Sequence, residues 1–405
     1  MDSHTRRDQL SLFDRTRFQI GMCLALCGVP LAMLLNFVVP VFSWSPVIMA
    51  SSAILLFDGF NKQHKSVNKP ILKVIILFQL LMVLYWLINP AHDFKMLAFH
   101  LFVICFYFVI RGNGNALYCN YLSALFLYSG FLSIVFAILE YLGFFSYDYW
   151  VLMGASDASE KTLEFFTANI AAYTNLVTCN VLLSKRNKWG LKLFYLGMCI
   201  VDMYVIMYSG KRSYFVASLF VISYFLFKTK AYKKYLPLIV GAFIFAMIAI
   251  PEVRDSFVGL IERTFSGFTD VYGGKKVAYD ENSSSAIRAY NLGLTLKAFN
   301  NFSFLELIFG RGYLAFYIDN PLLESYMDMG FLGFIFYSLI VVIYPIVRLV
   351  KNRIQNNYST LTLLLLFFNT TICFTNNNPY VYYVYTPAIL LAIYSNRVHQ
   401  SIKNK

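Results

Sequence analysis

Lys211 and Arg212 are the two charges whose position is least expected from their surroundings, because they stand in a short connection between two apolar stretches. An arginine guanidinium pairs bidentately with phosphate and cannot lose its proton in a protein. Arg311 has the same chemistry later in the chain, close to two carboxylates, Asp319 and Glu324. A carboxylate in a partly desolvated site can have its pKa raised toward the working pH and then accept a proton from a hydroxyl group. These residue types could hold a phosphate and activate a hydroxyl, if the fold brings them together.

The elements that must position them are long apolar stretches, each read as a membrane-spanning helix. About twelve are expected, at residues 18–40, 43–60, 70–89, 94–110, 117–143, 163–184, 190–208, 213–228, 235–251, 322–347, 358–376 and 380–396. The fold class predicted is therefore an all-α integral membrane protein, and residues 1–405 form a single polytopic membrane domain. Composition agrees, with 59% hydrophobic and 14% charged residues, against about 25% charged in an ordinary soluble domain.

The orientation follows from the basic residues. When the stretches alternate across a membrane, most of the 34 Lys and Arg fall on one side, as expected when positive loops stay cytoplasmic. This predicts a membrane protein with both termini in the cytoplasm. The net charge of +13 then faces anionic lipid headgroups, so we expect no nucleic acid partner. Lys211 and Arg212 lie on the outer side, against the orientation rule.

One connection is much longer than the others, between the ninth and tenth stretches, at residues 252–321, and it is expected on the outer side. Its apolar residues after 287 recur with an imperfect helical period. The apolar segment 304–309 is far too short to span, and could lie along the interface or re-enter the membrane. Asn320 as N-cap and Pro321 as first helical residue predict the start of the tenth span.

Metal and disulfide chemistry have no support in the sequence. The seven cysteines lie in or beside apolar segments and none is in the long outer loop, which argues against a zinc site or a disulfide framework. The chain has no D-x-D triplet for a metal-bound nucleotide sugar. We therefore expect neither a metal nor another cofactor.

The segment from about 200 to 340 resembles the O-antigen ligase and polymerase (Wzy-type) superfamily. The family pattern has a Ser/Gly-Arg segment opening a helix, then a long periplasmic loop with an Arg before an apolar helical stretch. It ends with a His-Asn pair followed after nine residues by Gly-x-x-Gly. The similar elements in this chain are Ser209-Gly210-Lys211-Arg212-Ser213, Arg288 in SSSAIRAYNLGLTLKAF, Gly310-Arg311-Gly312, and Asp319-Asn320 with Gly330-Phe331-Leu332-Gly333.

One departure from the family pattern favours the polymerase branch. The ligases need a histidine in the loop motif, and Asp319 occupies that position in this chain. The five histidines, His4, His64, His92, His100 and His399, all lie outside the long loop. The resemblance thus implies a polymerase of the bacterial inner membrane, with residues 252–321 as its long periplasmic loop. Such a polymerase moves a growing glycan from one undecaprenyl pyrophosphate carrier to a second lipid-linked repeat unit at the periplasmic face.

This reaction assigns expected roles to the residues. The catalytic candidates are Arg212, Arg288, Asp319 and Glu324, and the candidates for binding the pyrophosphate are Lys211, Arg212, Arg288 and Arg311. With no metal, these cations would stabilise the charge that develops on the leaving pyrophosphate. The partners expected are the undecaprenyl pyrophosphate-linked oligosaccharide and membrane lipid, and a chain-length regulator protein is a further partner that the residues leave open.

Simpler interpretations stand beside these roles. Lys211 and Arg212 can extend to lipid headgroups along their flexible stems, Arg311 can meet lipid phosphate, and Arg288 can be a solvated charge on an interfacial helix. Asp319 and Asn320 can serve only to cap the following helix. The aromatic cluster Tyr380, Tyr382, Tyr383 and Tyr385 is expected to be an interfacial belt, and loop tyrosines such as Tyr313 are candidates for stacking on sugars.

Two other functions remain open. An O-antigen ligase would share the fold and the donor, and the missing loop histidine is the feature against it. A lipid-linked oligosaccharide flippase, which is not an enzyme, also has about twelve spans. Its loops would be short and its charges would face a central cavity, whereas Asp202 is the main charge expected at mid-membrane depth here.

Overall fold

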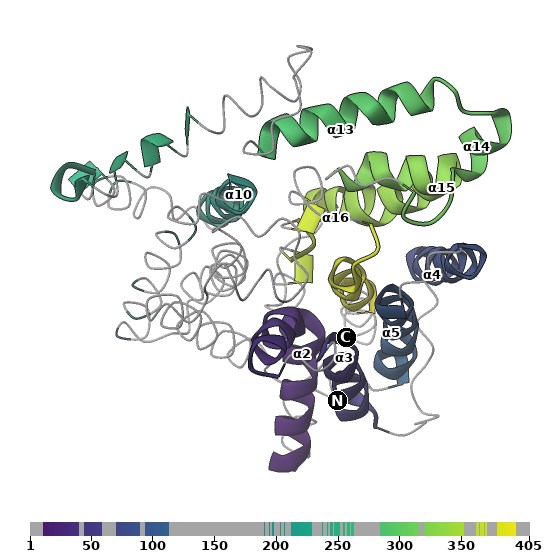
Figure 1. Cartoon of the computed structure of the whole chain (residues 1–405). Coiled ribbons are helices and arrows are strands. Elements are labelled where there is room, and N and C mark those ends of the chain that lie inside the picture. Colours follow the sequence, from purple (N-terminus) through teal and green to yellow (C-terminus); the bar gives the residue numbers. More distant parts are fainter. Residues whose placement is uncertain are drawn as a thin grey trace.

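The computed structural model describes residues 11–39, 44–58, 70–89, 94–112, 212–228, 284–315, 320–351 and 379–393, with single residues between 190 and 262 and between 362 and 370. Helices account for most of this part, and no strand occurs among the described residues. The all-α expectation is confirmed for that part of the chain. In Figure 1 the colours of the helices follow the sequence, from purple at the N-terminus to yellow at the C-terminus.

The helices have the following bounds: α2 Leu12–Val38, α3 Trp44–Leu56, α4 Pro70–Ile88, α5 Phe94–Gly112, α10 Arg212–Lys228, α13 Ser284–Phe299, α14 Phe304–Phe309, α15 Pro321–Ser338, the π-helical turn η2 Leu339–Ile343, α16 Tyr344–Lys351 and the 3₁₀ turn η3 Tyr382–Val384. Residues 385–393 continue as a helix after η3.

Within the described part of the chain, two helical stretches, Pro70–Ile88 and Pro321–Val350, are long and apolar enough to cross a membrane. Shorter apolar helices occur at Trp44–Leu56, Met96–Arg111 and Phe215–Tyr224. The expected spans 117–143 and 163–184 lie outside the described residues. The total of twelve spans, the inner-membrane location and the cytoplasmic termini therefore stay predictions.

Local capping explains where the helices after residue 300 begin. The side chain of Asn320 accepts a hydrogen bond from the Leu323 N–H at 3.2 Å, and Pro321 is the first helical residue, so the predicted start of this helix is confirmed. In α14, Ser303 and Glu306 form a reciprocal capping box. Such a box satisfies two backbone N–H groups at the helix start, which matters for a helix of only six residues.

The predicted single helix over 322–347 is interrupted at Gly330. This glycine has φ 64° and ψ −162°, a region that only glycine adopts readily. The stretch is therefore two helical segments that meet at a kink, with Pro321 to Met329 on one side and Phe331 onward on the other. The Gly-x-x-Gly motif that begins at Gly330 thus contains a break in the helix.

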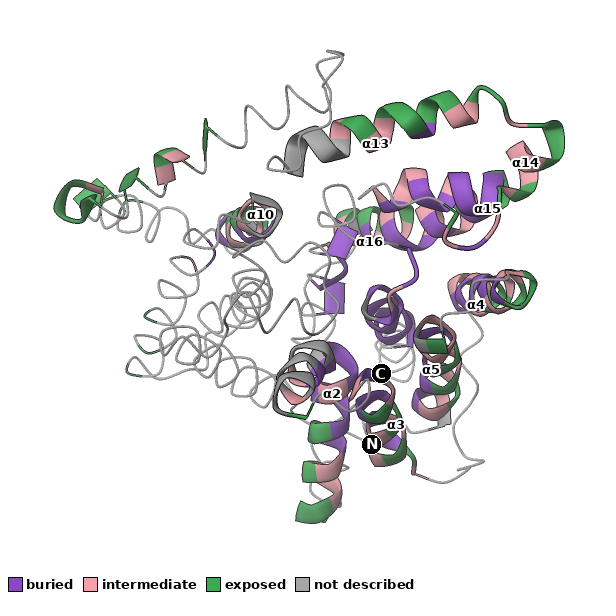
Figure 2. Ribbon diagram, viewed as in Figure 1, coloured by how far each residue is buried: buried purple, intermediate pink, exposed green. Residues whose placement is uncertain are grey.

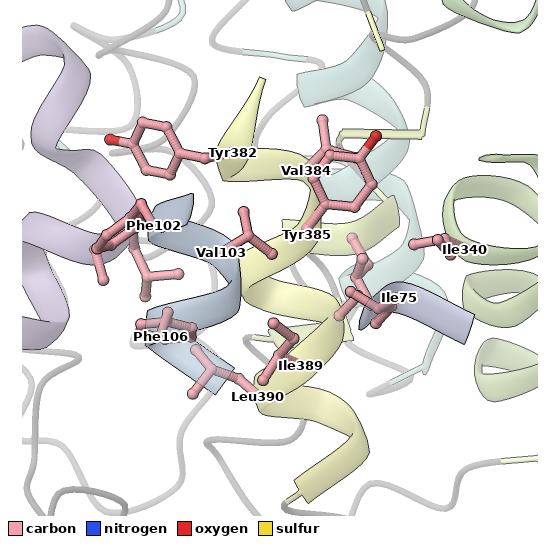
Figure 3. Packing of buried hydrophobic residues seen from close by; sticks show 14 of the residues in the cluster. Ile75, Phe102, Val103, Phe106, Ile340, Tyr382, Val384, Tyr385, Ile389 and Leu390 are labelled. Atoms are coloured by element: carbon pink, nitrogen blue, oxygen red, sulfur yellow. The ribbon is translucent and has the colours of Figure 1, made fainter. Parts of the chain in front are cut away.

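The core is built around the C-terminal helical segment. Val384, Tyr385, Ile389 and Leu390 are 0% exposed, and a helix that is apolar on every side is a helix surrounded by protein or lipid. Figure 3 shows these side chains together with Ile75 of α4, Phe102, Val103 and Phe106 of α5, and Ile340 of η2. Figure 2 shows the same segment as buried, between α2, α5 and the start of α16.

Candidate functional site

A short segment after α14, residues 309–315, joins the end of that helix to the polar centre of the structure, and we call it the strap. Its backbone lies directly against α15. The N–H of Arg311 donates to the Met327 carbonyl at 3.0 Å and the N–H of Gly312 donates to the Asp328 carbonyl at 2.9 Å. A helix that ends leaves its last four carbonyls without donors of its own. The break at Gly330 thus leaves carbonyls that the strap satisfies.

Two glycines make this contact possible. A Cβ on Gly310 would collide with the backbone of Asp328, and a Cβ on Gly330 would collide with the backbone of Ile308. Both glycines have positive φ, 75° and 64° respectively. The turn Gly310-Arg311-Gly312 therefore lies against residues 327–329, directly before the motif that begins at Gly330, and Gly330 itself lies against residues 308–309, directly before the turn. These are two of the elements on which the family resemblance depends.

Three further hydrogen bonds tie the strap to two other parts of the chain. The Tyr85 hydroxyl of α4 donates to the Phe309 carbonyl at 2.5 Å, and the Asn89 amide donates to the Tyr313 carbonyl at 2.5 Å. The Leu314 N–H donates to the Tyr380 hydroxyl at 3.3 Å. A segment expected in the long outer loop is thus held against α4 and the C-terminal region by hydrogen bonds.

Beneath the strap lies a row of buried polar side chains. His100 of α5 is 0% exposed, its Nδ1 is 2.9 Å from Gln79 Oε1 of α4, and its Nε2 is 2.6 Å from the Tyr313 hydroxyl. The amide oxygen of Gln79 can only accept, so Nδ1 is the donor of the first hydrogen bond. Through its two ring nitrogens the imidazole joins α4, α5 and the strap.

Two carboxylates of α15 complete the row. Glu324 and Asp328 are four residues apart, on one face of the helix, and both are 0% exposed. The Tyr380 hydroxyl donates to Asp328 Oδ2, and the Tyr380 ring lies 4.3 Å from that of Tyr313, centroid to centroid. Burial of a carboxylate is costly unless it is paired or hydrogen-bonded, so the tyrosine donor is important for keeping Asp328 at this position. We call Glu324, Asp328, Tyr313, Tyr380 and His100 the buried polar cluster.

Arg311 lies at the edge of this cluster, with about one third of its side chain exposed. Its Nε donates to Glu306 Oε1 at 3.0 Å, and its guanidinium lies 4.6 Å from the centroid of the Phe302 ring. Hydrogen bonding from Ser303, first from its backbone N–H, lowers the pKa of Glu306, and Arg311 lowers it further. The carboxylate is therefore ionised near neutral pH and orients the guanidinium, and an anionic ligand at Arg311 would compete with it.

The predicted site residues differ in how far the structure describes them. Arg212 is the first residue of α10 and Arg288 lies in α13, but both side chains are outside the described part, as are Lys211 and Asp319 entirely. Glu324 and Arg311 are described, and both belong to the region where the strap meets α15. The roles assigned to Lys211, Arg212, Arg288, Arg311, Asp319 and Glu324 stay predictions.

Sequence reasoning missed most of the buried polar cluster. Gln79 and His100 each stand inside an apolar stretch, and a polar residue at such a position is a signal for function or for a buried contact. Asp328 gave the same signal in the stretch 322–347. Tyr313 was considered for sugar stacking, but it is 2% exposed and its ring lies against Tyr380.

The expectation of an aromatic belt at the start of the last helix is wrong for three of its tyrosines. Tyr380, Tyr382 and Tyr385 are 0%, 2% and 0% exposed, and Tyr382 lies against the rings of Phe99 and Phe102, with centroids 5.4 Å and 5.2 Å away. Belt residues contact lipid headgroups, whereas these side chains are enclosed by α5, α15 and the strap.

Comparison of the chain with protein-family models, with curated proteins and with solved structures gave no match in any of the three searches. The arrangement of the strap against the kink of α15, above a buried cluster of carboxylates and tyrosines, is therefore what a functional proposal must explain.

Proposed function

We propose that this chain is an O-antigen polymerase, a metal-independent glycosyltransferase of the bacterial inner membrane. It would transfer the growing glycan from one undecaprenyl pyrophosphate carrier to a new lipid-linked repeat unit at the periplasmic face. The observation that carries the proposal is the backbone contact of Gly310-Arg311-Gly312 with residues 327–329 and of Gly330 with residues 308–309. Glu324 is buried one helical turn before Asp328. Two elements of the family resemblance that are 18 residues or more apart in sequence thus contribute to one place in the fold.

The chemistry requires a cation and a base at neighbouring positions. The acceptor hydroxyl oxygen forms a bond to the anomeric carbon of the donor, and the bond from that carbon to the pyrophosphate oxygen breaks. The proton of the hydroxyl goes to a carboxylate, for which Glu324 and Asp319 are the candidates. The leaving undecaprenyl pyrophosphate takes the electron pair and needs positive charge close by, for which Arg212, Arg288, Arg311 and Lys211 are the candidates.

Arg311 supports this division of roles by its geometry. It is partly exposed, and its pairing with Glu306 and Phe302 holds the guanidinium at the end of α14. A preorganised cation loses less free energy on binding phosphate than a free side chain, because its conformation is already restricted. The carboxylate of Glu324 is four residues from Asp328, whose backbone carbonyl accepts from the strap.

The test is complementation of a clean deletion in the native host, read from the gel banding pattern of lipopolysaccharide. We expect the deletion to leave core bearing a single repeat unit and the wild-type gene to restore the ladder. Arg212→Ala and Arg288→Ala, at wild-type expression, should each fail to restore it. Arg254→Ala is the matched control, because the Arg254 side chain is 57% exposed and pairs with that of its neighbour Asp255.

Other outcomes would redirect the assignment. Bare core in the deletion strain would mean a ligase or a flippase, and the side of the membrane on which the carrier-linked glycan accumulates would decide between them. If Arg212→Ala and Arg288→Ala both make full-length polymer, those two arginines are not part of the site.

A further inference from the structure

The kink at Gly330 divides the stretch Pro321–Val350 into two parts of different character. The part before it contains the buried carboxylates Glu324 and Asp328, and the 20 residues from 331 to 350 contain one charge, Arg348, close to the far end. At 1.5 Å per residue these 20 residues are about 30 Å long, which matches the hydrocarbon thickness of a bilayer. The length and the charge pattern therefore both place the outer boundary of the hydrocarbon at the kink.

Helix α14 lies at the level of this kink. The close approach of Gly330 to the backbone of Ile308, and of Gly310 to the backbone of Asp328, leaves no room for a layer of side chains between the two elements. In Figure 1, α14 connects the end of α13 to the strap beside α15. A helix in contact with residues 328–330 is thus at the boundary between hydrocarbon and headgroups.

No residue in the described part of the chain covers the apolar side chains at the two ends of α14. Phe304 is 74% exposed, Leu305 is 66% exposed and Phe309 is 48% exposed, and no residue of α14 is buried. On α15, Phe331, next in sequence to the kink, is also exposed, at 54%. In Figure 2 the helix is coloured only as intermediate or exposed.

We propose that α14 lies in the outer leaflet of the membrane, with Phe304, Leu305 and Phe309 inserted among the lipid headgroups and upper acyl chains. Lipid is the occupant that fits, because α14 packs against the start of the segment whose length matches the bilayer. An apolar surface on an interfacial helix binds to a bilayer by burial of its apolar area. This proposal does not depend on the reaction that the chain performs.

Photocrosslinking in the full-length chain, in native membranes, tests the proposal directly. The photoreactive residue p-benzoylphenylalanine replaces Phe304 in one variant and Leu305 in a second, so that failure of one variant to fold leaves the other. The same photoreactive residue at Leu84 of α4 is the positive control, because this side chain is 52% exposed on a candidate span and should form lipid adducts. Leu12 of α2, 80% exposed, lies before the expected first span, 18–40, and is the control for exposure without lipid.

After irradiation, mass spectrometry identifies what is attached to the chain. We expect phospholipid adducts at positions 304 and 305 at the level of position 84 and several-fold above position 12. Adducts at the low level of position 12 would overturn the proposal. A covalent dimer of the chain, or a different protein attached at 304 and 305, would also overturn it and would identify the true occupant of this surface.

Discussion

Substitution of Gly310 by alanine tests whether the contact between the strap and α15 holds this region together. At φ 75° and ψ −173°, a residue with a Cβ is strained by about 1–3 kcal/mol. The new Cβ would also collide with the Asp328 backbone, and relief of such overpacking costs about 1–3 kcal/mol more. Backbone atoms cannot move aside as a flexible side chain can, so we expect the strap to separate from α15.

The chain provides controls that separate these two effects. Gly312 has φ 120° but open space where a Cβ would be, so Gly312→Ala should carry the strain alone. Gly293 lies within α13 with open space around it, and Gly293→Ala should stabilise the helix by about 0.5–1 kcal/mol. Gly330→Ala should behave like Gly310→Ala, because the two glycines face each other's segments.

The measurement is thermal unfolding of the purified proteins in detergent, together with hydrogen exchange at residues 303–315. We expect stability to fall in the order Gly293→Ala, wild type, Gly312→Ala and then the pair Gly310→Ala and Gly330→Ala. Exchange in the strap should accelerate in the last two variants. If Gly310→Ala unfolds and exchanges like Gly293→Ala, the close contact between the strap and α15 does not exist and the reasoning is refuted.

Two further predictions concern single side chains. Tyr380→Phe removes the donor to buried Asp328 and should destabilise the protein by about 1–3 kcal/mol or more. Tyr85→Phe removes one hydrogen bond at an exposed site and should cost only about 0.5–1.5 kcal/mol. Equal midpoints of thermal unfolding for the two variants would contradict the burial of the cluster. The pKa of Glu306 is lowered in the folded protein. The stability that its ionised carboxylate gives to α14 is therefore complete above the ordinary pKa of 4.5 and is lost as the pH falls below that value. Hydrogen exchange of the α14 amides should therefore rise more at low pH in the wild type than in Glu306→Gln, which keeps the capping box without a titrating group. Parallel profiles of exchange rate against pH in the two proteins would show that the charge of Glu306 does not stabilise the helix.

Short-range signals made the helix boundaries predictable. The start of α4 at Pro70, the start of α15 after Asn320, and the start of α10 at Arg212 each follow from residues within one helical turn. A cap or a change from polar to apolar acts over that distance. The expectation of a helix after residue 287, and of a separate short segment at 304–309, has the same origin.

Such short-range signals do not predict the kink in α15. Glycine occurs inside many apolar helices without a break, and nothing within one turn of Gly330 requires φ of 64°. The backbone of Ile308 does require it, because only this conformation lets the two chains approach so closely. A contact between residues 22 apart in sequence therefore determines a local backbone angle.

The sequence by itself determined the helical class, the apolar stretches and the caps, because these depend on hydrophobicity and on hydrogen bonds between near neighbours. Only the tertiary structure decided that His100 would meet Tyr313, that Tyr380 would donate to Asp328, and that three expected belt tyrosines would be buried. These pairs are separated by 213 and 52 residues. Their formation depends on how whole helices pack, which the periodicity of any one helix does not specify.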